Sequence, residues 1–277
     1  MNKEYVLITG ATGFIGGHVA NKLLSEGKYA LIAIVRKSDK YRNVEELKQR
    51  GAILVEGIFY DENLIAKVFN KFPIRYVIHI AALRGGGAGT EGKYHTVNVH
   101  GTEVLLEGSL SHQVKKFIFC SSVGVFGTIP CELPANINTR LNGDNAYHRS
   151  KIAAEQKVQK FIDKGLDAFV VRPAITYGSN DDGFSAILVK LVRKRLLLLP
   201  SNENSIHLLD VHKLVEVFTK TLAFQGRQKR FFIVADDQPV PLRELVDLIY
   251  YYFNKRKYPK VLQLPTIIYD TLLLIFQ

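Results

Sequence analysis

A tyrosine, a lysine and a serine near the middle of the chain have the types and the spacing for proton transfer. Tyr147 and Lys151 are four residues apart, so on a helix they lie on the same face. An unperturbed tyrosine has a pKa near ~10 and is a poor acid–base at neutral pH, but a neighbouring ammonium group lowers that pKa. Ser122, 25 residues before the tyrosine, can hydrogen-bond to a substrate carbonyl or alcohol. These three residues are the predicted catalytic group.

A glycine-rich segment near the amino end has the spacing of a dinucleotide-binding loop. Gly10, Gly13 and Gly16 follow an apolar run and open a segment with helical periodicity, which is the context that such a motif requires. The first glycine permits a tight turn, the second lets the backbone approach a pyrophosphate, and the third lets the helix pack on the sheet. The amino end of the helix adds free N–H groups and a positive dipole. The predicted cofactor-binding residues here are Gly10, Thr12, Gly13, Phe14, Ile15 and Gly16.

The residues after the second predicted strand indicate which cofactor binds. Sites that prefer NAD place an acidic residue there to bind the ribose 2′-hydroxyl, whereas this chain has Arg36 and Lys37, with no carboxylate before Asp39. A guanidinium can hold a 2′-phosphate with paired hydrogen bonds. The sequence therefore favours NADP(H), with Arg36 and Lys37 as contacts, over NAD(H). The other interpretation is that Arg36 is only a solvated strand end.

Strand-like and helical segments alternate along the chain and must position these residues. Short apolar runs without polar alternation predict buried parallel strands at 5–9, 31–35, 53–55, 77–80, 117–120 and 169–171. Between them, helical spacing occurs at 14–25, 45–50, 64–69, 97–110 and 146–162. The pattern predicts an α/β fold with a Rossmann-type doubly wound parallel sheet over residues 1–178. A smaller α/β substrate lobe, interleaved with the main sheet, is predicted over 179–277, with helices at 184–195, 213–222 and 242–253 and strands near 196–199 and 231–234.

Composition and charge narrow the possible partners. The net charge is +11 without a basic tail, which argues against nucleic-acid binding and suits an anionic cofactor or substrate. A basic run at 190–195 is predicted to be a solvated helix end, with a phosphate or membrane-surface contact as its alternative. The two cysteines form no disulfide framework, which fits a reducing cytoplasm. No metal site is predicted.

Neither end of the chain indicates a membrane location. The first residues run directly into a predicted strand, so we expect no signal peptide, and no run reaches the ~18 apolar residues of a membrane span. The apolar stretch at 267–276 is predicted to pack on the lobe or on a dimer partner, or to be left exposed by truncation. Its shortness and the absence of a basic polar face argue against a peripheral membrane contact. A glycine-rich loop at 85–89 is predicted where a substrate could enter.

Further motifs follow one another in a fixed order. They lie at 79–82 (His-Ile-Ala-Ala), 98–102 (Asn-Val-His-Gly-Thr), 121–127 (Ser-Ser-Val-Gly-Val-Phe-Gly) and 172–178 (Arg-Pro-Ala-Ile-Thr-Tyr-Gly). With the elements above, they make the chain resemble an extended short-chain dehydrogenase/reductase of the epimerase/dehydratase-like group. That group includes nucleotide-sugar epimerases, dihydroflavonol-type reductases and 3β-hydroxysteroid dehydrogenases. The resemblance covers nearly the whole chain.

The resemblance implies a role for each matching residue. Tyr147 is the implied acid–base, Lys151 its modulator and a contact to the nicotinamide ribose, and Ser122 the carbonyl-binding partner. Asn98 is implied to brace the sheet near the site. Further implied contacts to the cofactor come from Ala81, Ala82, Pro173 and Ile175. A homodimer through the helices at 97–110 and 146–162 is also a family expectation.

Two segments depart from the family pattern. Many relatives have Gly-Asp-Leu after the third strand, with the aspartate on the adenine. Here Asp61 either replaces that contact or caps the next helix, and the sequence slightly favours the cap. Nucleotide-sugar enzymes commonly place a phosphate-binding arginine before a His-Val-Asp-Asp-like stretch, and here Ser205 takes its place.

Three functions are compatible with these features. The favoured one is an NAD(P)-dependent oxidoreductase that transfers a hydride between nicotinamide, NADPH by preference, and a small-molecule carbonyl or alcohol, with Tyr147 as acid–base. The alternative is a nucleotide-sugar 4-epimerase or dehydratase with tightly bound NAD. A non-enzymatic cofactor sensor on the same fold is disfavoured because the chain retains both Tyr147 and Lys151.

Overall fold

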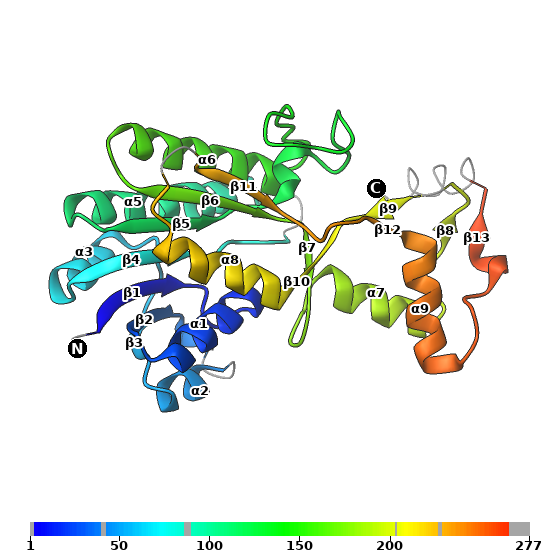
Figure 1. Ribbon diagram of the computed structural model, residues 1–277, viewed down its shortest axis with the longest axis horizontal. Helices are drawn as coiled ribbons and strands as arrows, with labels where there is room; N and C mark the ends of the chain where they lie inside the picture. The colour runs from blue at the N-terminus through cyan, green and yellow to red at the C-terminus, as the bar shows by residue number, and fades with distance from the viewer. Residues whose placement is uncertain (1–2, 40–42, 86–89, 203, 227–228, 266–277) are drawn as a thin grey trace. The chain divides into compact units, whose positions relative to one another are not determined.

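The chain divides into two compact units (Figure 1). The computed structural model describes residues 3–39, 43–85, 90–202, 204–226 and 229–265. The first unit comprises Met1–Pro173 and Val211–Val234, and the second comprises Ala174–Asp210 and Ala235–Gln277. The division therefore differs from a single boundary after residue 178, because residues 211–234 return to the first unit. The predictions for residues 86–89 and 267–276 lie outside the described residues.

A seven-stranded parallel sheet forms the centre of the first unit (Figure 1). In spatial order its strands are β11 (Phe231–Val234), β6 (Ala168–Pro173), β5 (Lys116–Cys120), β4 (Ile74–His79), β1 (Glu4–Thr9), β2 (Tyr29–Val35) and β3 (Ile53–Glu56). The Rossmann-type fold predicted from six apolar runs is confirmed. The strand at 231–234, predicted in the smaller lobe, instead extends this sheet, with Phe231 opposite Val170.

Helices cover both faces of the sheet. They are α1 (Phe14–Glu26), α2 (Val44–Gln49), α3 (Glu62–Lys71), α4 (Glu91–Tyr94), α5 (Gly101–Ser111), α6 (Ala146–Asp163) and α8 (Val211–Ala223), with short turns η1 (Lys37–Asp39), η2 (His95–His100) and η3 (Val123–Phe126). The chain leaves β1 toward β2 and β4 toward β5 in opposite directions. Right-handed crossovers therefore place α1 and α5 on opposite faces. The helix predicted at 97–110 is a π-helical turn, η2, that continues into α5.

Local sequence signals define several of the helix ends. The Asp61 carboxylate accepts a hydrogen bond from Leu64 N at 3.1 Å, so Asp61 caps α3, as the sequence favours. Asn145 caps α6 by accepting from His148 N at 2.9 Å. α1 ends at Gly27, whose φ of 67° is the left-handed conformation that glycine adopts without strain. The Asn145 cap fixes where α6, the helix of Tyr147 and Lys151, begins.

The second unit packs two helices together beside short paired strands. Its elements are β7 (Ile175–Tyr177), α7 (Phe184–Arg193), β8 (Leu199–Pro200), β9 (Ser205–Ile206), β10 (Leu208–Asp210), β12 (Val240–Pro241), α9 (Leu242–Asn254), η4 (Lys260–Leu262) and β13 (Gln263–Leu264). Val192 of α7 packs in one buried cluster with Val246, Tyr250 and Tyr258. Across the described ranges of both units, no helix has the length and apolar character needed to cross a membrane.

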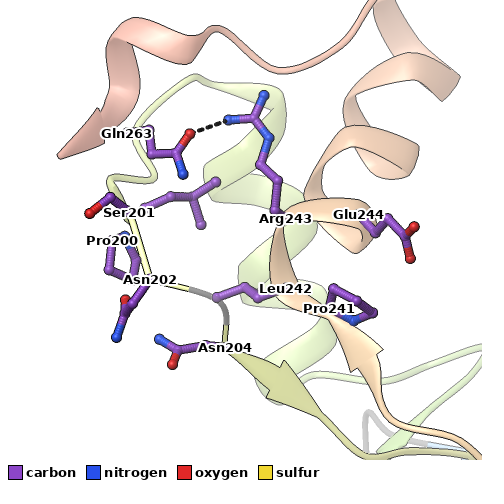
Figure 2. A pocket seen from close by; sticks show the side chains of 10 residues that line it. Pro200, Ser201, Asn202, Asn204, Pro241, Leu242, Arg243, Glu244 and Gln263 are labelled. Atoms are coloured by element: carbon purple, nitrogen blue, oxygen red, sulfur yellow. Dashed lines mark hydrogen bonds between the residues drawn. The ribbon is translucent and has the colours of Figure 1, made fainter. Parts of the chain in front are cut away.

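A cavity of about 350 Å³ lies in the second unit beside the first turn of α9 (Figure 2). Amide and hydroxyl side chains contribute much of its lining, and Arg243 is a cation within it. The Arg243 guanidinium donates to the Tyr258 carbonyl oxygen at 2.6 Å and to Asp247 Oδ2 at 3.2 Å. These bonds use the Arg243 guanidinium to hold the segment after α9. Arg243 is the arginine that lines this cavity, so it is not available there to bind a phosphate.

Candidate active site

Most of the predicted site residues of the first unit lie at one edge of the sheet. The carboxyl ends of parallel strands share an edge, and here β1, β4, β5 and β6 end there. The order of the strands reverses between β1 and β4, which is where open α/β sheets bind ligands. The glycine segment follows β1, Ala81 and Ala82 follow β4, Ser122 follows β5, and Pro173 ends β6.

Two of the three glycines, Gly10 and Gly16, are packed too closely against backbone to accept side chains. Gly10 has a φ of +79°, and a Cβ there would lie 2.8 Å from Ala81 N. A Cβ on Gly16 would lie 2.0 Å from the Gly10 carbonyl oxygen. α1 begins after Gly13 with no side-chain cap and no acidic residue in its first turn. The amino end of α1 thus presents backbone N–H groups and a positive dipole that suit a pyrophosphate.

A chain of hydrogen bonds fixes the backbone at Ala81. The Thr102 hydroxyl donates to the Asn98 carbonyl oxygen at 2.6 Å, so it accepts from His79 Nε2 at 3.0 Å. His79 Nδ1 then accepts from the Thr9 hydroxyl at 2.7 Å, and Thr9 Oγ1 accepts from Ala81 N at 3.2 Å. Burial, then the charge of Lys151, hold the pKa of His79 well below its ordinary value. A neutral imidazole with one donor and one acceptor is what this chain of bonds requires.

Asn98 ties the segment after β4 to α6. Its Oδ1 accepts from Leu83 N at 2.7 Å, and its Nδ2 donates to the Leu83 carbonyl oxygen at 3.1 Å. The same Nδ2 donates to Ser150 Oγ at 2.9 Å, next to Lys151 on α6. Asn98 lies in the π-helical turn η2, a distortion common at functional sites. The bracing role implied by the family resemblance is present.

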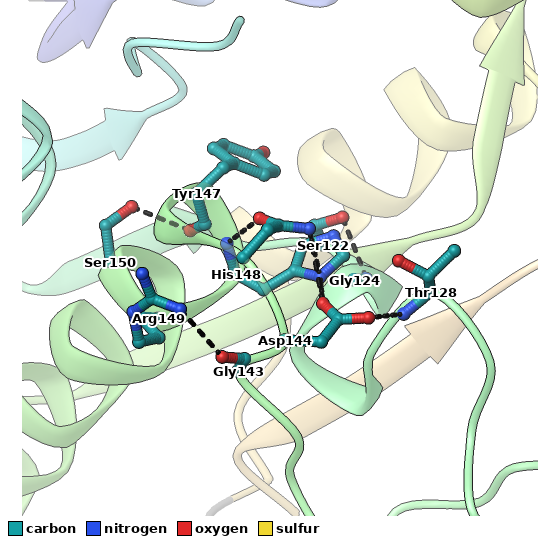
Figure 3. A network of polar contacts seen from close by, with 10 residues as sticks. Ser122, Gly124, Thr128, Gly143, Asp144, Tyr147, His148, Arg149 and Ser150 are labelled. Carbon is teal, nitrogen blue, oxygen red and sulfur yellow. Dashed lines mark hydrogen bonds and ion pairs between the residues drawn. The ribbon is translucent and has the colours of Figure 1, made fainter. Parts of the chain in front are cut away.

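Tyr147 and Ser122 come together at the start of α6 (Figure 3). Burial raises the pKa of Tyr147 to about 12, while the charge of Arg84 and a hydrogen bond with Ser122 act in the lowering direction. The sequence predicts a lowered pKa instead. The difference arises because the desolvation of the phenol outweighs the charges nearby. In the ligand-free protein Tyr147 is therefore a protonated phenol at neutral pH.

Lys151, one helical turn after Tyr147 on α6, is buried. Its side chain is 2% exposed, its Nζ donates to the Cys120 carbonyl oxygen at 2.8 Å, and it lies 4.6 Å from the centre of the Phe119 ring. Burial lowers the pKa of Lys151 to about 8, although the charge of Glu155 is among the influences that raise it. Lys151 is thus fixed at the end of β5 and is protonated at neutral pH, although burial disfavours its charge.

His148 supports the turn that carries Ser122 (Figure 3). Gly124 N donates to Ser122 Oγ at 3.0 Å, and a Cβ on Gly124 would lie 2.4 Å from His148 Nε2, so the imidazole covers this glycine. His148 Nδ1 lies 2.5 Å from Asp144 Oδ1. Burial opposes the charge of Asp144, but hydrogen bonds from Thr128 and His148 lower its pKa to about 2. An anionic Asp144 thus orients the ring that packs behind the serine.

Sequence reasoning missed two residues near the phenol. Arg84 lies close enough for its charge to act on both Tyr147 and Lys151. The Tyr94 ring is 6.3 Å from the Tyr147 ring. A signal for Arg84 was available, because it is the only cation in the short segment that follows β4 and carries Ala81.

The remaining predicted cofactor contacts are placed differently. Arg36 and Lys37 are exposed where β2 ends, and Asp61 caps α3, so any role of these residues toward the adenosine stays a prediction. Phe14 is buried and Pro173 pairs with Val234 inside the sheet, which leaves mainly their backbone for a ligand. Ile175 belongs to the second unit, in β7.

Known proteins are similar to this chain over much of its length. The model of the NAD dependent epimerase/dehydratase family matches residues 6–239. A dTDP-D-glucose 4,6-dehydratase of Dictyostelium discoideum is 31% identical over 216 residues, which are 72% of this chain and 49% of that protein. The UDP-glucose 4-epimerase of Homo sapiens is 31% identical over 195 residues, 65% of this chain and 56% of that protein. The chain spans about half the length of the curated relatives it matches.

Solved structures agree with the family model. The UDP-glucose 4-epimerase of Thermotoga maritima with UDP-glucose has a TM-score of 0.77 and 26% identity, covering 94% of this chain and 85% of that one. The Bordetella bronchiseptica enzyme WbmH in complex with NAD+ has a TM-score of 0.80 at 21% identity, covering 93% and 84%, and supports the fold. The chain belongs to the NAD dependent epimerase/dehydratase family of extended short-chain dehydrogenases/reductases.

Proposed function

We propose that the chain is an NAD-dependent epimerase or dehydratase acting on a nucleotide-activated sugar. The carrying observation is that Tyr147, Ser122 and Lys151 assemble where β5 ends, in a chain similar to UDP-glucose 4-epimerases and to a dTDP-D-glucose 4,6-dehydratase. Both names specify chemistry at position 4 of a glucosyl group. A proton must leave or join an oxygen there, and Tyr147 is the group suited to move it.

Each residue has a distinct task in this proposal. When bound, the dinucleotide supplies a reversible hydride acceptor. Tyr147 exchanges a proton with the sugar oxygen, and Ser122, held by Gly124 N, orients that oxygen by a hydrogen bond. The charge of Arg84 favours the phenolate and so offsets part of the desolvation that raises the pKa of Tyr147. Lys151, anchored on the Cys120 carbonyl oxygen, adds a second cation at the end of β5.

A specific observation favours a second candidate, an NADPH-dependent carbonyl reductase. Arg36 and Lys37 are exposed immediately after β2, in the place where a 2′-phosphate would be bound. Ser205, on β9, is also exposed, and by the family resemblance it takes the place of a phosphate-binding arginine. Under this alternative, Tyr147 and Ser122 act on the carbonyl of a substrate that carries no nucleotide.

The experiment that separates the two candidates combines bound-cofactor analysis with thermal unfolding of the purified chain. Co-purified NAD, together with a rise in Tm on adding UDP-glucose or dTDP-glucose, supports the epimerase or dehydratase proposal, because a ligand that binds the native state must raise Tm. A rise with NADPH but not NADH, and none with either sugar, refutes it and favours the reductase.

Removing the phenol hydroxyl tests the chemistry that both candidates share. Tyr147→Phe is expected to lower turnover on the order of 100-fold to 10,000-fold, the range for a lost general acid–base, while NAD binding stays near wild type. Tyr29→Phe is the matched control, since Tyr29 begins β2, at the opposite edge of the sheet. A Tyr147→Phe variant with wild-type turnover contradicts the assigned role.

A further inference from the structure

One face of the second unit leaves large apolar side chains exposed. On α9, Leu248, Tyr251 and Tyr252 have i, i+3 and i+4 spacing and therefore share a face, where they are 67%, 53% and 73% exposed. The same helix buries Val246 and Tyr250 in the core of the unit. A surface helix normally turns polar side chains to solvent, so this second apolar stripe is not needed to fold the unit.

Cations from two segments border these rings. Arg193, at the end of α7, lies 5.5 Å from the centre of the Phe253 ring. Lys255 lies 5.9 Å from the rings of both Tyr251 and Tyr252. The exposed residues 193–196, 248, 251–253 and 255–257 together are called the basic aromatic face.

Hydrogen bonds hold the two segments of this face together. The Tyr258 hydroxyl donates to the Leu197 carbonyl oxygen at 2.8 Å and accepts from Leu197 N at 3.2 Å. Arg195 Nε donates to the Tyr250 hydroxyl at 2.6 Å. The residues after α7 and those after α9 therefore form one continuous surface rather than two separate patches.

The six exposed charges of the basic aromatic face are positive, and the nearest exposed carboxylate on α9 is Glu244, one turn before Leu248. Residues 184–202 and 248–265 contain no aspartate or glutamate. The exposed cations of the face are Arg193, Lys194, Arg195, Lys255, Arg256 and Lys257. A surface of this kind attracts a polyanion, and its aromatic and aliphatic side chains gain further free energy only if the partner also offers an apolar layer.

We propose that the basic aromatic face docks on an anionic membrane surface. Tyrosine rings concentrate at the boundary between headgroups and acyl chains, and lysine and arginine beside them bind anionic headgroups. Leu248 and Leu196 can enter the apolar layer, while the cations stay among the headgroups. In the sequence the run at 190–195 is distant from 248–257, and the pattern therefore does not predict a membrane contact. The structure instead joins the first of these to α9.

Two other occupants fit the face less well. A second copy in a two-fold dimer would set this patch against itself, which places six cations opposite six more. A single-stranded nucleic acid could stack on the tyrosines, but Leu248 and Leu196 have no comparable contact to make with stacked bases. The inference uses residues of the second unit alone and does not depend on the proposed function.

Vesicle sedimentation with the full chain tests this proposal. The wild type is expected to bind vesicles of phosphatidylglycerol and phosphatidylcholine, more strongly at low salt, and to bind pure phosphatidylcholine far less. Replacing the three cations of 255–257 by glutamine is expected to weaken binding on the order of 100-fold, since each cation near an anionic surface contributes about fivefold. Tyr251→Ser with Tyr252→Ser is expected to weaken binding at every salt concentration.

The matched control is Lys71→Gln, because Lys71 also lies over an aromatic ring, at 5.2 Å from Phe72, but belongs to the first unit. It is expected to bind like the wild type, and Tm reports whether each variant is folded. Equal binding to neutral and anionic vesicles, or unchanged binding of the 255–257 variant, overturns the proposal. So does binding that is lost on deleting 266–277 but kept in both surface variants. Tighter binding to single-stranded RNA than to vesicles, or a dimer that the surface variants dissociate, likewise overturns it.

Discussion

Replacing Lys151 by methionine is expected to stabilise the ligand-free protein at neutral pH while removing a residue of the proposed site. Lys151 is 2% exposed, and burial lowers its pKa from 10.5 to about 8. At pH 7 the amine is still protonated, so the folded state holds a charge where the surroundings disfavour one. Methionine has a similar length and no charge to desolvate. The variant thus separates the cost of the buried cation from the packing of its side chain.

The magnitude follows from the two pKa values. Between about pH 8 and pH 10.5 the unfolded chain binds the lysine proton more tightly than the folded protein, so the free energy of unfolding rises with pH. Because one unit of pKa shift corresponds to about 1.4 kcal/mol, the charge costs about 3 kcal/mol at pH 7 and about 1 kcal/mol at pH 9.5. Methionine forfeits the hydrogen bond to the Cys120 carbonyl oxygen, which contributes about 1.5–3 kcal/mol when the donor is charged. The net gain expected at pH 7 is about 1 kcal/mol.

Urea unfolding followed by far-UV circular dichroism measures both values. The stability of Lys151→Met relative to wild type is expected to fall by about 2 kcal/mol between pH 7 and pH 9.5, because only the wild type has the Lys151 proton to lose over that range. Tyr147, with its pKa raised to about 12, does not ionise there. The control is Lys164→Met, since Lys164 is exposed and lies 4.5 Å over the Phe161 ring. A difference between Lys151→Met and wild type that is the same at both pH values refutes the reasoning.

Two further substitutions test how the site is held. Gly16→Ala is expected to lower NAD affinity on the order of 100-fold, because its Cβ would lie 2.0 Å from the Gly10 carbonyl oxygen and displace the loop. A cofactor titration measures this affinity. The control is Gly92→Ala, whose Cβ meets nothing within 4 Å and which should leave NAD affinity unchanged. Glu155→Gln is expected to lower the free energy of unfolding by about 3–5 kcal/mol, because it leaves the buried charge of Arg172 unpaired. A loss below about 1 kcal/mol in a denaturant titration would show that the pair is dispensable.

The positions of the first six strands of the central sheet could be predicted from the sequence, and the place of the last strand could not. Runs such as 117–120 are apolar at consecutive positions, which only a strand buried on both faces requires, and β5 is the result. The run at 231–234 has the same character, but nearly sixty residues separate it from β6. A local apolar pattern does not show that the chain leaves the sheet after β6, forms the second unit and then returns to add β11. The apolar spacing predicts the helix at 97–110, but it does not predict the π-helical turn at the start of that helix.

The chemistry of the site depended on features that spacing does not encode. Spacing predicts that Tyr147 and Lys151 share a face, and they do lie on one helix. It does not predict how dry their surroundings are, and burial is what raises the pKa of Tyr147 and lowers that of Lys151. Arg84 and the contact between Asp144 and His148 arise from loops that meet only in the folded chain.

The buried ion pair between α6 and β6 explains how the two sides of the site keep their relative placement. Arg172 Nε and Nη2 donate to the two carboxylate oxygens of Glu155 at 2.9 and 2.6 Å, and both side chains are almost fully buried. The guanidinium lies 5.1 Å from the Phe126 ring and 5.2 Å from the Phe231 ring, a packing that accounts for a buried Nη1 with no hydrogen-bond partner among the described residues.

A pair of apolar residues of equal volume would cost less to bury, so stability alone does not account for these charges. Glu155 is one helical turn after Lys151, and Arg172 directly precedes Pro173 at the carboxyl edge of the sheet. A bidentate pair allows only one register between α6 and β6, whereas apolar side chains tolerate sliding. We infer that the pair sets the register of the catalytic helix. The double variant Glu155→Leu with Arg172→Met should then restore much of the stability lost by Glu155→Gln without restoring turnover. If the double variant recovers both stability and turnover, the ion pair has no positioning role.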